Sequence, residues 1–585
     1  MTFDSAVVAN STSLALVTIT TALVGIWIWS KQKPTKDFPP GPKGWPLVGN
    51  IIDLARNEKP ASVAFMEYAK EYGDIFSIRV GQRWVVVLNG AATIKEALLK
   101  KGVEFANRPT SYTGDLFSEG GRDIIFGQYS PSWKLHRKLA FSAFRNLATG
   151  DNKRFEKLVY SIVPGLTANL DSKLSEPFDP RPILASSIYN ILTSLCFGKQ
   201  YEFDSPELTR IMYLSKEANE IGGSGLLADY IPIFKYVPTP GQRKLEALFK
   251  EFLGFISQEL EEHHEKYDGG EPKDFIEMLF QSRQEIKDEG KEDMNLITET
   301  HIRQTVLDVF SAGTDTSIFT MHWCVGLMVQ YPEVQAKVAE EVDRVVGRDR
   351  LPSLNDREEL VYTTATLYEV MRYSTITPLA MPHATLTDVE FGGYTIPKDT
   401  WVLVNIYSMH FEEKLWDEPN KFTPGKVIRG QHGSQSENIV HTISQEVEVA
   451  GSSNVVCCLL LPLKKILLGS KRQANLLLLT YALLYCKILM CCTVVSLFAM
   501  TEHFLDESGK VRLHPEGFMP FSTGRRVCIG ESVAKAELFL IFAWLCQHYK
   551  FSKPTGREEK DFAEGNPQAI VNMMKDIEVV VEKRF

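Results

Sequence analysis

The feature that most constrains the fold is a turn-rich segment, residues 520–530, with one cysteine close to the start of a helical run. Cys528 lies two residues before Gly530, and residues 531–545 behind it have the composition of a helix. Backbone N–H groups and the dipole at a helix N-terminus lower the pKa of a nearby thiol and favour the thiolate, which binds metal ions. The segment therefore predicts a metal ligand at Cys528, and a buried structural cysteine is the alternative.

The residues around this cysteine suit a flat, acidic cofactor. Gly524 and Gly530 allow the backbone to turn tightly and to approach such a group closely. Phe521 can shield the sulfur from water, and Arg526 offers a fixed cation to an acid group. The spacing Phe-x-x-Gly-x-Arg-x-Cys-x-Gly resembles the haem-binding loop of the cytochrome P450 family. This resemblance implies a mainly α fold with small β-sheets, and a haem b (heme b) whose iron is ligated by Cys528.

Composition argues against nucleic acid as a partner and favours a reducing compartment. The 585 residues hold 64 Lys plus Arg against 73 Asp plus Glu, and a net charge of -9 offers no electrostatic footprint for nucleic acid. Of the nine cysteines, five lie between positions 457 and 492, and the other four have no zinc or disulfide spacing. The length is ample for a core that encloses a cofactor.

The N-terminus predicts a membrane anchor. Residues 13–29 are uncharged and near the ~20 residues needed to span a bilayer, and three lysines follow them, which places the rest of the chain in the cytoplasm. The rival interpretation is a cleaved signal peptide, which would carry its positive charges before the apolar run. We therefore predict a single-pass transmembrane helix at residues 1–30. The Pro/Gly-rich segment 31–50 resembles the hinge of microsomal family members, which implies the endoplasmic reticulum membrane.

Two basic sites and a histidine resemble the family's contacts to the haem propionates. Trp133 and Arg137 are four residues apart and share one face of a predicted helix, as in the family's Trp-x-x-x-Arg helix. Arg108 matches an Arg-Pro that serves the same end in related steroid hydroxylases. His383 occupies the place of a propionate-binding His or Arg. Taken alone, an arginine is more often a solvated surface charge.

A long helix predicted over residues 298–330, capped by Thr298, carries the second motif. Two small residues beginning at Ala312 leave room for a flat ligand, and Thr316 can bond back to the carbonyl four residues earlier. The run resembles the family's (Ala/Gly)-Gly-x-(Asp/Glu)-Thr-(Thr/Ser) motif. The resemblance implies that Asp315 and Thr316 relay protons to bound dioxygen. A small-residue packing face is the alternative.

Two further patterns carry structural expectations. Residues 75–80 and 84–88 predict a hairpin that turns at Gly81. Glu369 and Arg372 resemble the family's Glu-x-x-Arg, which is buried and locks the loop that leads to the cysteine. As a bare pair, they are also typical of a helix surface.

The middle of the chain predicts broken helices and one loop. Residues 204–267 indicate helices interrupted at Gly222 and near Pro238, with one apolar face. In the family this region is the mobile lid over the substrate, whereas periodicity alone indicates ordinary core packing. Residues 282–295 are polar and rich in charge, and we expect them to form a loop.

One segment departs from the family pattern. The catalytic domain is expected over 51–424 and 502–585, because removal of 425–501 restores the motif Phe-x-Pro-Glu-His-Phe. The inserted residues are apolar and rich in cysteine, and a second membrane span there would draw the cysteine loop to the bilayer. We therefore favour a retained intron, a hypothesis that sequencing the transcript tests. His503 also stands where the family has Arg, which weakens the network of Glu369 and Arg372.

The resemblance implies a haem-thiolate monooxygenase that inserts one oxygen atom from O2 into a lipophilic small molecule. The chain has no flavin or nicotinamide fingerprint, so NADPH–cytochrome P450 reductase is the implied electron donor, with cytochrome b5 as a further candidate partner. Local similarity is greatest to the animal microsomal steroid 17-alpha-hydroxylase/17,20-lyase and aromatic-hydrocarbon hydroxylase group. The expected substrate is therefore a steroid, with an aromatic xenobiotic as the alternative. An isomerase or dehydratase of the same fold, or a membrane protein that the insertion prevents from binding haem, are the alternatives.

Overall fold

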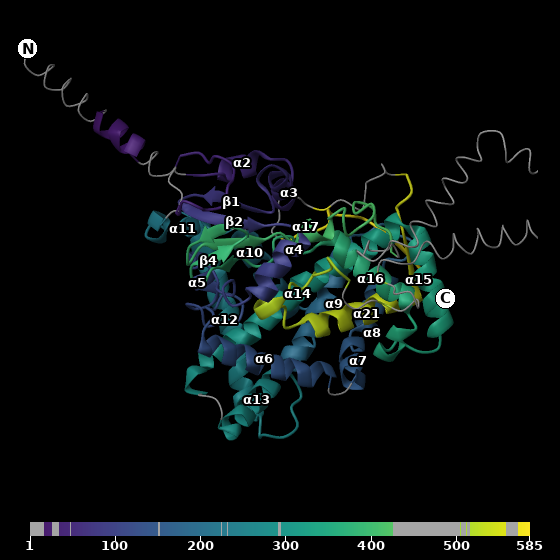
Figure 1. The fold of residues 1–585 in the computed structure, drawn as a ribbon. Helices are drawn as coiled ribbons and strands as arrows, with labels where there is room; N and C mark the ends of the chain where they lie inside the picture. The colour runs from purple at the N-terminus through teal and green to yellow at the C-terminus, as the bar shows by residue number, and fades with distance from the viewer. Residues whose placement is uncertain are drawn as a thin grey trace, which may run out of the picture.

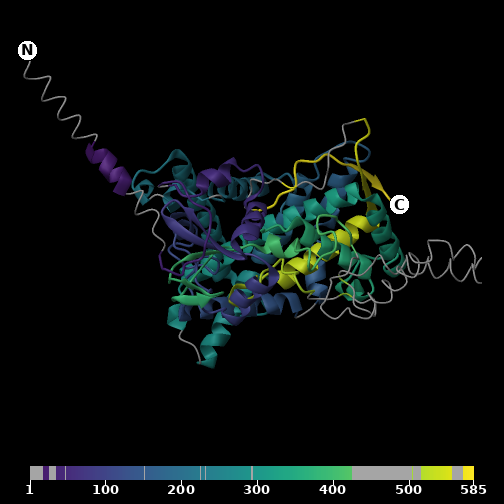
Figure 2. The ribbon, with the colours of Figure 1, turned by 45° about the horizontal axis from the view of Figure 1, so that its top comes forward.

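A computed structural model describes most of the chain as a helical protein with small sheets (Figures 1 and 2). The described residues are 17–25, 34–46, 48–149, 152–223, 225–230, 232–290, 294–424, 504, 511, 515–556, 565 and 571–585. The predicted fold class, mainly α with small β-sheets, is confirmed.

Nine longer helices build the body of the described part. They are α6 (Pro131–Thr149), α9 (Arg181–Phe197), α10 (Pro206–Gly222), α12 (Pro240–Lys266), α13 (Phe275–Glu289), α14 (Glu299–Gln330), α15 (Pro332–Val345), α16 (Val361–Ser374) and α21 (Glu531–His548). The shorter helices are α2 (Ile51–Arg56), α3 (Ala61–Tyr72), α4 (Ala91–Lys95), α5 (Tyr112–Phe117), α7 (Asn152–Tyr160), α8 (Val163–Asp171), α11 (Leu227–Tyr230) and α17 (Ile406–His410). The short turns include η2 (Pro232–Lys235) and η5 (Gly524–Arg526).

The sheets are small and lie at the edges of the helical body (Figure 1). The largest has the order β1-β2-β6-β3, with β1 (Ile75–Val80), β2 (Arg83–Leu88), β3 (His383–Ala384) and β6 (Trp401–Val404). The β1–β2 hairpin is antiparallel and turns at Gly81 with φ 60°, as predicted. Two further two-stranded sheets pair β4 (Val389–Phe391) with β5 (Tyr394–Ile396), and β7 (Tyr549–Ser552) with β8 (Val580–Lys583).

Helix α14 runs through the middle of the bundle and packs against α9, α12, α16 and α21. Its predicted start is confirmed, because the backbone N–H of Thr298 donates to Nδ1 of His301 at 3.1 Å and closes the first turn. It ends at Gln330 because a proline follows Tyr331. A helix with neighbours on several sides must be apolar around much of its circumference, and most of α14 is buried.

The segment 204–267 divides as expected, into α10 and α12 with breaks at Gly222 and before Pro240. The loop predicted over 282–295 is wrong in its first half, because α13 continues to Glu289. Its Glu, Gln, Arg and Lys side chains are strong helix formers. Ser282 and Ile286, four residues apart, bury one face of this extension, and Gly290 ends it in the left-handed region.

Two predicted features fall largely outside the described residues. Residues 17–25 form an exposed helix, and the remainder of the apolar run 13–29 is not described. Within the part of the chain that is described, no helix has the length and apolar character to cross a membrane. The segment 425–501 and His503 also lie outside the described residues.

Candidate functional site

The loop before α21 is tightly turned around Cys528. Gly524 has φ 76°, and a Cβ atom there would lie 2.1 Å from the carbonyl oxygen of Leu98, so only glycine fits. The Cys528 N–H donates to the carbonyl oxygen of Phe521 at 3.1 Å and closes the loop on itself. The Cys528 sulfur is 3.9 Å from the position that a Cβ at Gly530 would take. The loop thus presents the sulfur at the start of α21.

The predicted lowering of the Cys528 pKa is wrong in direction for the protein alone. Burial raises the pKa of the thiol, and the N–H groups of Gly530 and Glu531 and the charge of Arg137 lower it only in part. The side chain nevertheless keeps exposed surface. The sulfur is therefore accessible to a ligand. A metal ion bound there would deprotonate it outright.

Arg526 is fixed on the inner side of the same loop. Its guanidinium group donates to the carbonyl oxygens of Ala106 at 2.8 Å, Ile124 at 3.1 Å and Gly127 at 2.6 Å. It lies 3.8 Å from the centroid of the Trp133 ring, where a cation is attracted by the π face. Burial and the charges of two other arginines lower the pKa of Arg526 to about 8.

Those two arginines are the predicted residues Arg108 and Arg137. Arg108 is buried and donates to the carbonyl oxygens of Ile125 at 2.8 Å and Pro382 at 2.9 Å. Arg137, on α6, donates to the carbonyl oxygen of Val527, the residue before the cysteine, and lies 5.6 Å from the Trp133 ring centroid. The structure therefore brings Arg108, Trp133, Arg137 and Arg526 together, although up to 418 positions of sequence lie between them.

His383 joins the same cluster from strand β3. Its Nδ1 bonds to the carbonyl oxygen of Phe105 at 2.7 Å, which leaves Nε2 for another partner. Burial and the charges of Arg108 and Arg526 lower the pKa of His383 to about 3, so the ring is neutral. An anion placed among these cations would reverse that effect and favour the protonated ring, which could then donate through Nε2.

The cluster contains more positive than negative charge. Its three guanidinium groups bind neutral carbonyl oxygens, and the carboxylate that acts on them is Asp123. Burial raises the pKa of Asp123 to about 6, and burial raises that of Asp308 on α14 well above its ordinary value. Burial favours the neutral form of both carboxyl groups, so they leave the positive charge of the three arginines largely unbalanced. A haem, whose two propionates carry two negative charges, fits this cluster.

The sequence alone gave no signal for Asp123 or Asp308. Asp123 accepts from the N–H of Phe126, and Asp308 accepts from the N–H of Ile124 at 2.7 Å. Both carboxyl groups therefore hold the loop whose carbonyl oxygens bind Arg526. Asp308 reaches this loop across 184 positions of sequence, a contact that no local pattern encodes.

Helix α14 runs unbroken through this motif, and the predicted bond of Thr316 back to the helix backbone is confirmed. Ala312 is exposed although the helix around it is largely buried, and Thr316 Oγ1 donates to the carbonyl oxygen of Ala312 at 2.7 Å. A Cβ at Gly313 would lie 3.0 Å from Leu192, so this glycine allows close packing on α9. Burial raises the pKa of Asp315 to about 6, and its carboxylate accepts from Asn219 of α10.

A buried carboxyl group that the sequence analysis missed joins α14 to α21. Glu537 is fully buried and accepts from the hydroxyl of Ser317, the residue after Thr316. Burial raises its pKa to about 8, so it carries a proton at neutral pH. This bond joins α21, which begins behind Cys528, to the stretch of α14 that carries Asp315 and Thr316.

Glu369 and Arg372 form the predicted buried pair. Their guanidinium nitrogens and carboxylate oxygens lie 2.6 and 2.8 Å apart, and both side chains have no exposed surface. Arg372 also donates to the carbonyl oxygens of His410 at 2.8 Å and Pro419 at 3.0 Å. His410 accepts in turn from the N–H of Met519, just before the cysteine loop. The pair therefore fastens the chain that leads to Cys528.

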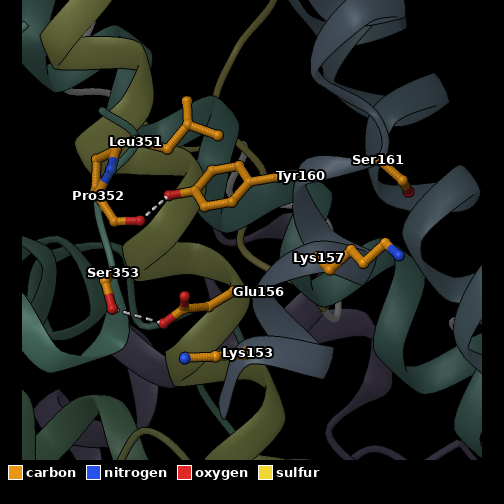
Figure 3. Close-up of a pocket in the computed structure, with 8 residues that line it drawn as sticks. All are labelled: Lys153, Glu156, Lys157, Tyr160, Ser161, Leu351, Pro352 and Ser353. Atoms are coloured by element: carbon orange, nitrogen blue, oxygen red, sulfur yellow. Dashed lines mark hydrogen bonds between the residues drawn. The ribbon is translucent and has the colours of Figure 1, made fainter. Parts of the chain in front are cut away.

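A surface depression of about 490 Å³ lies elsewhere, between α7 and the segment 351–353 (Figure 3). Figure 3 shows the Tyr160 hydroxyl bonded to the carbonyl oxygen of Pro352, and Glu156 bonded to Ser353. These bonds tie two surface segments together. None of the predicted site residues lines this depression, so we assign it no part in the chemistry.

Comparison with known proteins agrees with this geometry. The family model described as Cytochrome P450 matches residues 39–438 and 500–581. The chain is 30% identical to rat Cytochrome P450 2U1, over 91% of this chain and 88% of the relative. It is 28% identical to the Steroid 17-alpha-hydroxylase/17,20 lyase of Squalus acanthias, over 88% and 86%, and 29% identical to human Cytochrome P450 1A1, over 94% and 93%.

A solved structure is similar along almost the whole of its own length. It is a zebrafish cytochrome P450 with progesterone, 26% identical, with a TM-score of 0.67 and coverage of 89% of this chain and 99% of that one. The family implies a cysteine-ligated haem iron and electrons supplied by a redox partner. The cationic cluster and the cysteine loop fit that cofactor. The chain therefore belongs to the cytochrome P450 family of monooxygenases.

Proposed function

We propose that the protein inserts one oxygen atom from O2 into a lipophilic small molecule, with a steroid as the leading substrate class. The support is similarity to steroid 17-alpha-hydroxylase/17,20 lyases of a shark, a catfish and a frog, and to a solved structure that holds progesterone. Similar identity to Cytochrome P450 1A1 keeps an aromatic xenobiotic as the second candidate substrate.

The observation that carries this proposal is the cluster of buried cations beside Cys528. Arg108, Arg137 and Arg526 would bind the two propionates of a haem, with Trp133 and His383 completing the site. The Cys528 thiolate would ligate the iron, and Phe521 would shield it. When bound, the haem supplies the activation of dioxygen.

The stretch of α14 from Ala312 to Thr316 would deliver protons. Ala312 leaves exposed surface where a flat group can lie against the helix, and the hydroxyl of Thr316 stands beside it. Asp315, with a pKa raised to about 6, exchanges protons readily near neutral pH. We assign these two residues to proton delivery. An isomerase or dehydratase of the same fold, which needs no reductase, would have no use for this pair.

We further propose that the protein is anchored in the endoplasmic reticulum membrane by its N-terminal segment. The helix over residues 17–25 exposes apolar side chains, and so does the segment after α11, with Tyr236 and Val237. NADPH–cytochrome P450 reductase is the proposed electron donor, and cytochrome b5 a further partner.

The proposed division of the chain is an anchor at 1–30, a hinge at 31–50 and a catalytic domain at 51–424 and 502–585. Residues 425–501 would be an insertion, which the chain carries from a retained intron. Two observations support this division: the family match is interrupted between 438 and 500, and Phe504 is buried against Tyr368 and Phe518. Sequencing the mature message tests it.

A reduced carbon monoxide spectrum of the purified full-length protein tests the proposal. A band typical of thiolate ligation is expected, and Cys528→Ala should abolish it. If the wild-type protein lacks the band, the alternative of a membrane protein that binds no haem is favoured. NADPH consumption coupled to product then separates the monooxygenase from an isomerase. Spectral titration with progesterone and with a polycyclic aromatic compound decides the substrate class.

A further inference from the structure

One contact joins the end of α10 to the acid of the α14 motif. The side chain of Asn219 donates through Nδ2 to Oδ2 of Asp315, across 96 positions of sequence. Asn219 lies in the last turn of α10, where its own carbonyl oxygen accepts from the N–H of Gly223 at 2.8 Å. The bond therefore connects Asp315 to the point where α10 gives way to the segment before α11.

This bond directs Asp315 away from Thr316. The hydroxyl of Thr316 donates to the carbonyl oxygen of Ala312 at 2.7 Å, along the axis of α14. Consecutive residues of a helix point about 100° apart, and these two side chains bind different partners in this structure. We expect Asp315 to pass a proton to Thr316 only after its carboxyl group leaves Asn219.

The amide of Asn219 affects the charge of the Asp315 carboxyl group. Burial raises the pKa of the carboxyl group, and the hydrogen bond from Asn219 opposes burial by favouring the ionised form. Tyr189 of α9 faces the same carboxylate, and burial and the Asp315 charge both raise the pKa of its phenol, so it stays neutral. Ser215, one turn before Asn219 on α10, is neutral and buried. The amide of Asn219 is thus the group on α10 that holds the charge of Asp315.

We propose that Asn219 is a positioning residue that keeps the Asp315 carboxyl group ionised and turned toward α10 until α10 moves. A hydrogen bond weakens steeply with distance and misalignment, so a small displacement of the last turn of α10 would release the carboxyl group. Proton supply would then follow the position of α10. This inference rests on the proposed role of Asp315 in proton delivery.

Infrared spectroscopy of the holoenzyme tests the inference without relying on turnover. The difference between wild-type and Asp315→Asn spectra isolates the C=O band of protonated Asp315, whose growth is followed as pH falls. In Asn219→Leu the ionised carboxylate loses its donor, so the midpoint of this band should move to higher pH by about one unit. Asn219→Gln keeps an amide donor and should restore most of the wild-type midpoint.

Glu220→Gln, at the next and exposed position of α10, is the matched control and should leave the midpoint unchanged. An unchanged midpoint in Asn219→Leu, or no Asp315 band at any pH, overturns the inference. The carbon monoxide spectrum confirms that each variant holds haem. Product formed per NADPH in Asp315→Asn is a separate measurement. If it equals that of wild type, the proposed proton relay fails, whether or not Asn219 controls the carboxyl group.

Discussion

Two buried arginines of this protein satisfy their charge in different ways. Arg372 is fully buried and has its counter-charge within the chain, in the carboxylate of Glu369. Arg526 is also buried and binds carbonyl oxygens, but the charges that act on it include those of Arg108 and Arg137, which lower its pKa. A buried cation without an ionic partner is costly. The first arrangement is therefore structural, and the second suits an anionic ligand.

A third solution appears on α21. The Glu537 carboxyl group is buried beside the Ser317 hydroxyl, and a proton neutralises it. The molecule thus balances buried charge with a fixed ion pair, with a cofactor or with a proton. Each solution responds to a different perturbation: substitution of the partner, removal of the cofactor or a change of pH.

The largest effect is expected where the partner is internal. Glu369→Gln leaves Arg372 buried without its counter-charge, which typically costs about 3–5 kcal/mol. The stability of an ordinary domain is about 5–15 kcal/mol, so this loss is a large part of it. The variant should therefore yield little soluble protein. Denaturant unfolding measures the loss, and Glu359→Gln, an exposed position before α16, is the control. A Glu369→Gln variant as stable as the control would show that the pair is dispensable.

A smaller and different effect is expected in the cationic cluster. Arg137→Leu removes one of the cations that would bind a propionate. Haem affinity should fall by about 10- to 100-fold, because charge-assisted hydrogen bonds are worth about 1.5–3 kcal/mol. The stability of the haem-free protein should fall little, since the lost charge had no ionic partner. Haem retention on gel filtration measures the effect.

Lys134→Leu is the matched control, because it removes an exposed positive charge from the same helix. Equal haem loss in both variants would mean that net charge, and not the cluster, binds the cofactor. Arg137→Lys keeps the charge without the forked geometry and should fall between the two.

The third expectation concerns pH. The pKa of Glu537 is raised from 4.5 to about 8, so the folded protein binds a proton that the unfolded chain has released. The contribution of Glu537 to stability should be complete below pH 4.5 and should be lost as pH rises toward 8, by up to about 5 kcal/mol. Glu537→Gln stays neutral and should flatten that slope. Denaturant unfolding from pH 5.5 to 8.5 compares the two, and parallel curves would contradict the assignment.

The sequence could predict what is encoded locally. The turn at Gly81, the breaks that bound α10 and α12, and the return of Thr316 to the carbonyl oxygen of Ala312 each depend on residues a few positions apart. The arginines of the cluster were found through a resemblance of motifs. Their geometry around Trp133 came only with the structure.

What the sequence could not predict depends on distant contacts. Asp123, Asp308 and Glu537 look like ordinary surface acids until burial gives them their proton affinities. The same property overturned the expected pKa of Cys528: the helix N-terminus lowers it as predicted, but burial outweighs that effect. Burial depends on the whole fold. A local motif can therefore identify the groups around a thiol and still fail to predict whether its pKa is raised or lowered.

The smallest effect is expected for an ion pair with the same geometry on the surface. Arg210 and Glu251 are joined by two hydrogen bonds of 2.6 and 2.7 Å, and about half of each side chain is exposed. Water screens this pair and solvates either partner when the other is removed. Arg210→Ala should therefore match wild type, within error, in both thermal unfolding and haem content. A clear loss of stability would mean that forked geometry, and not burial, distinguishes Arg372 from other arginines of the molecule.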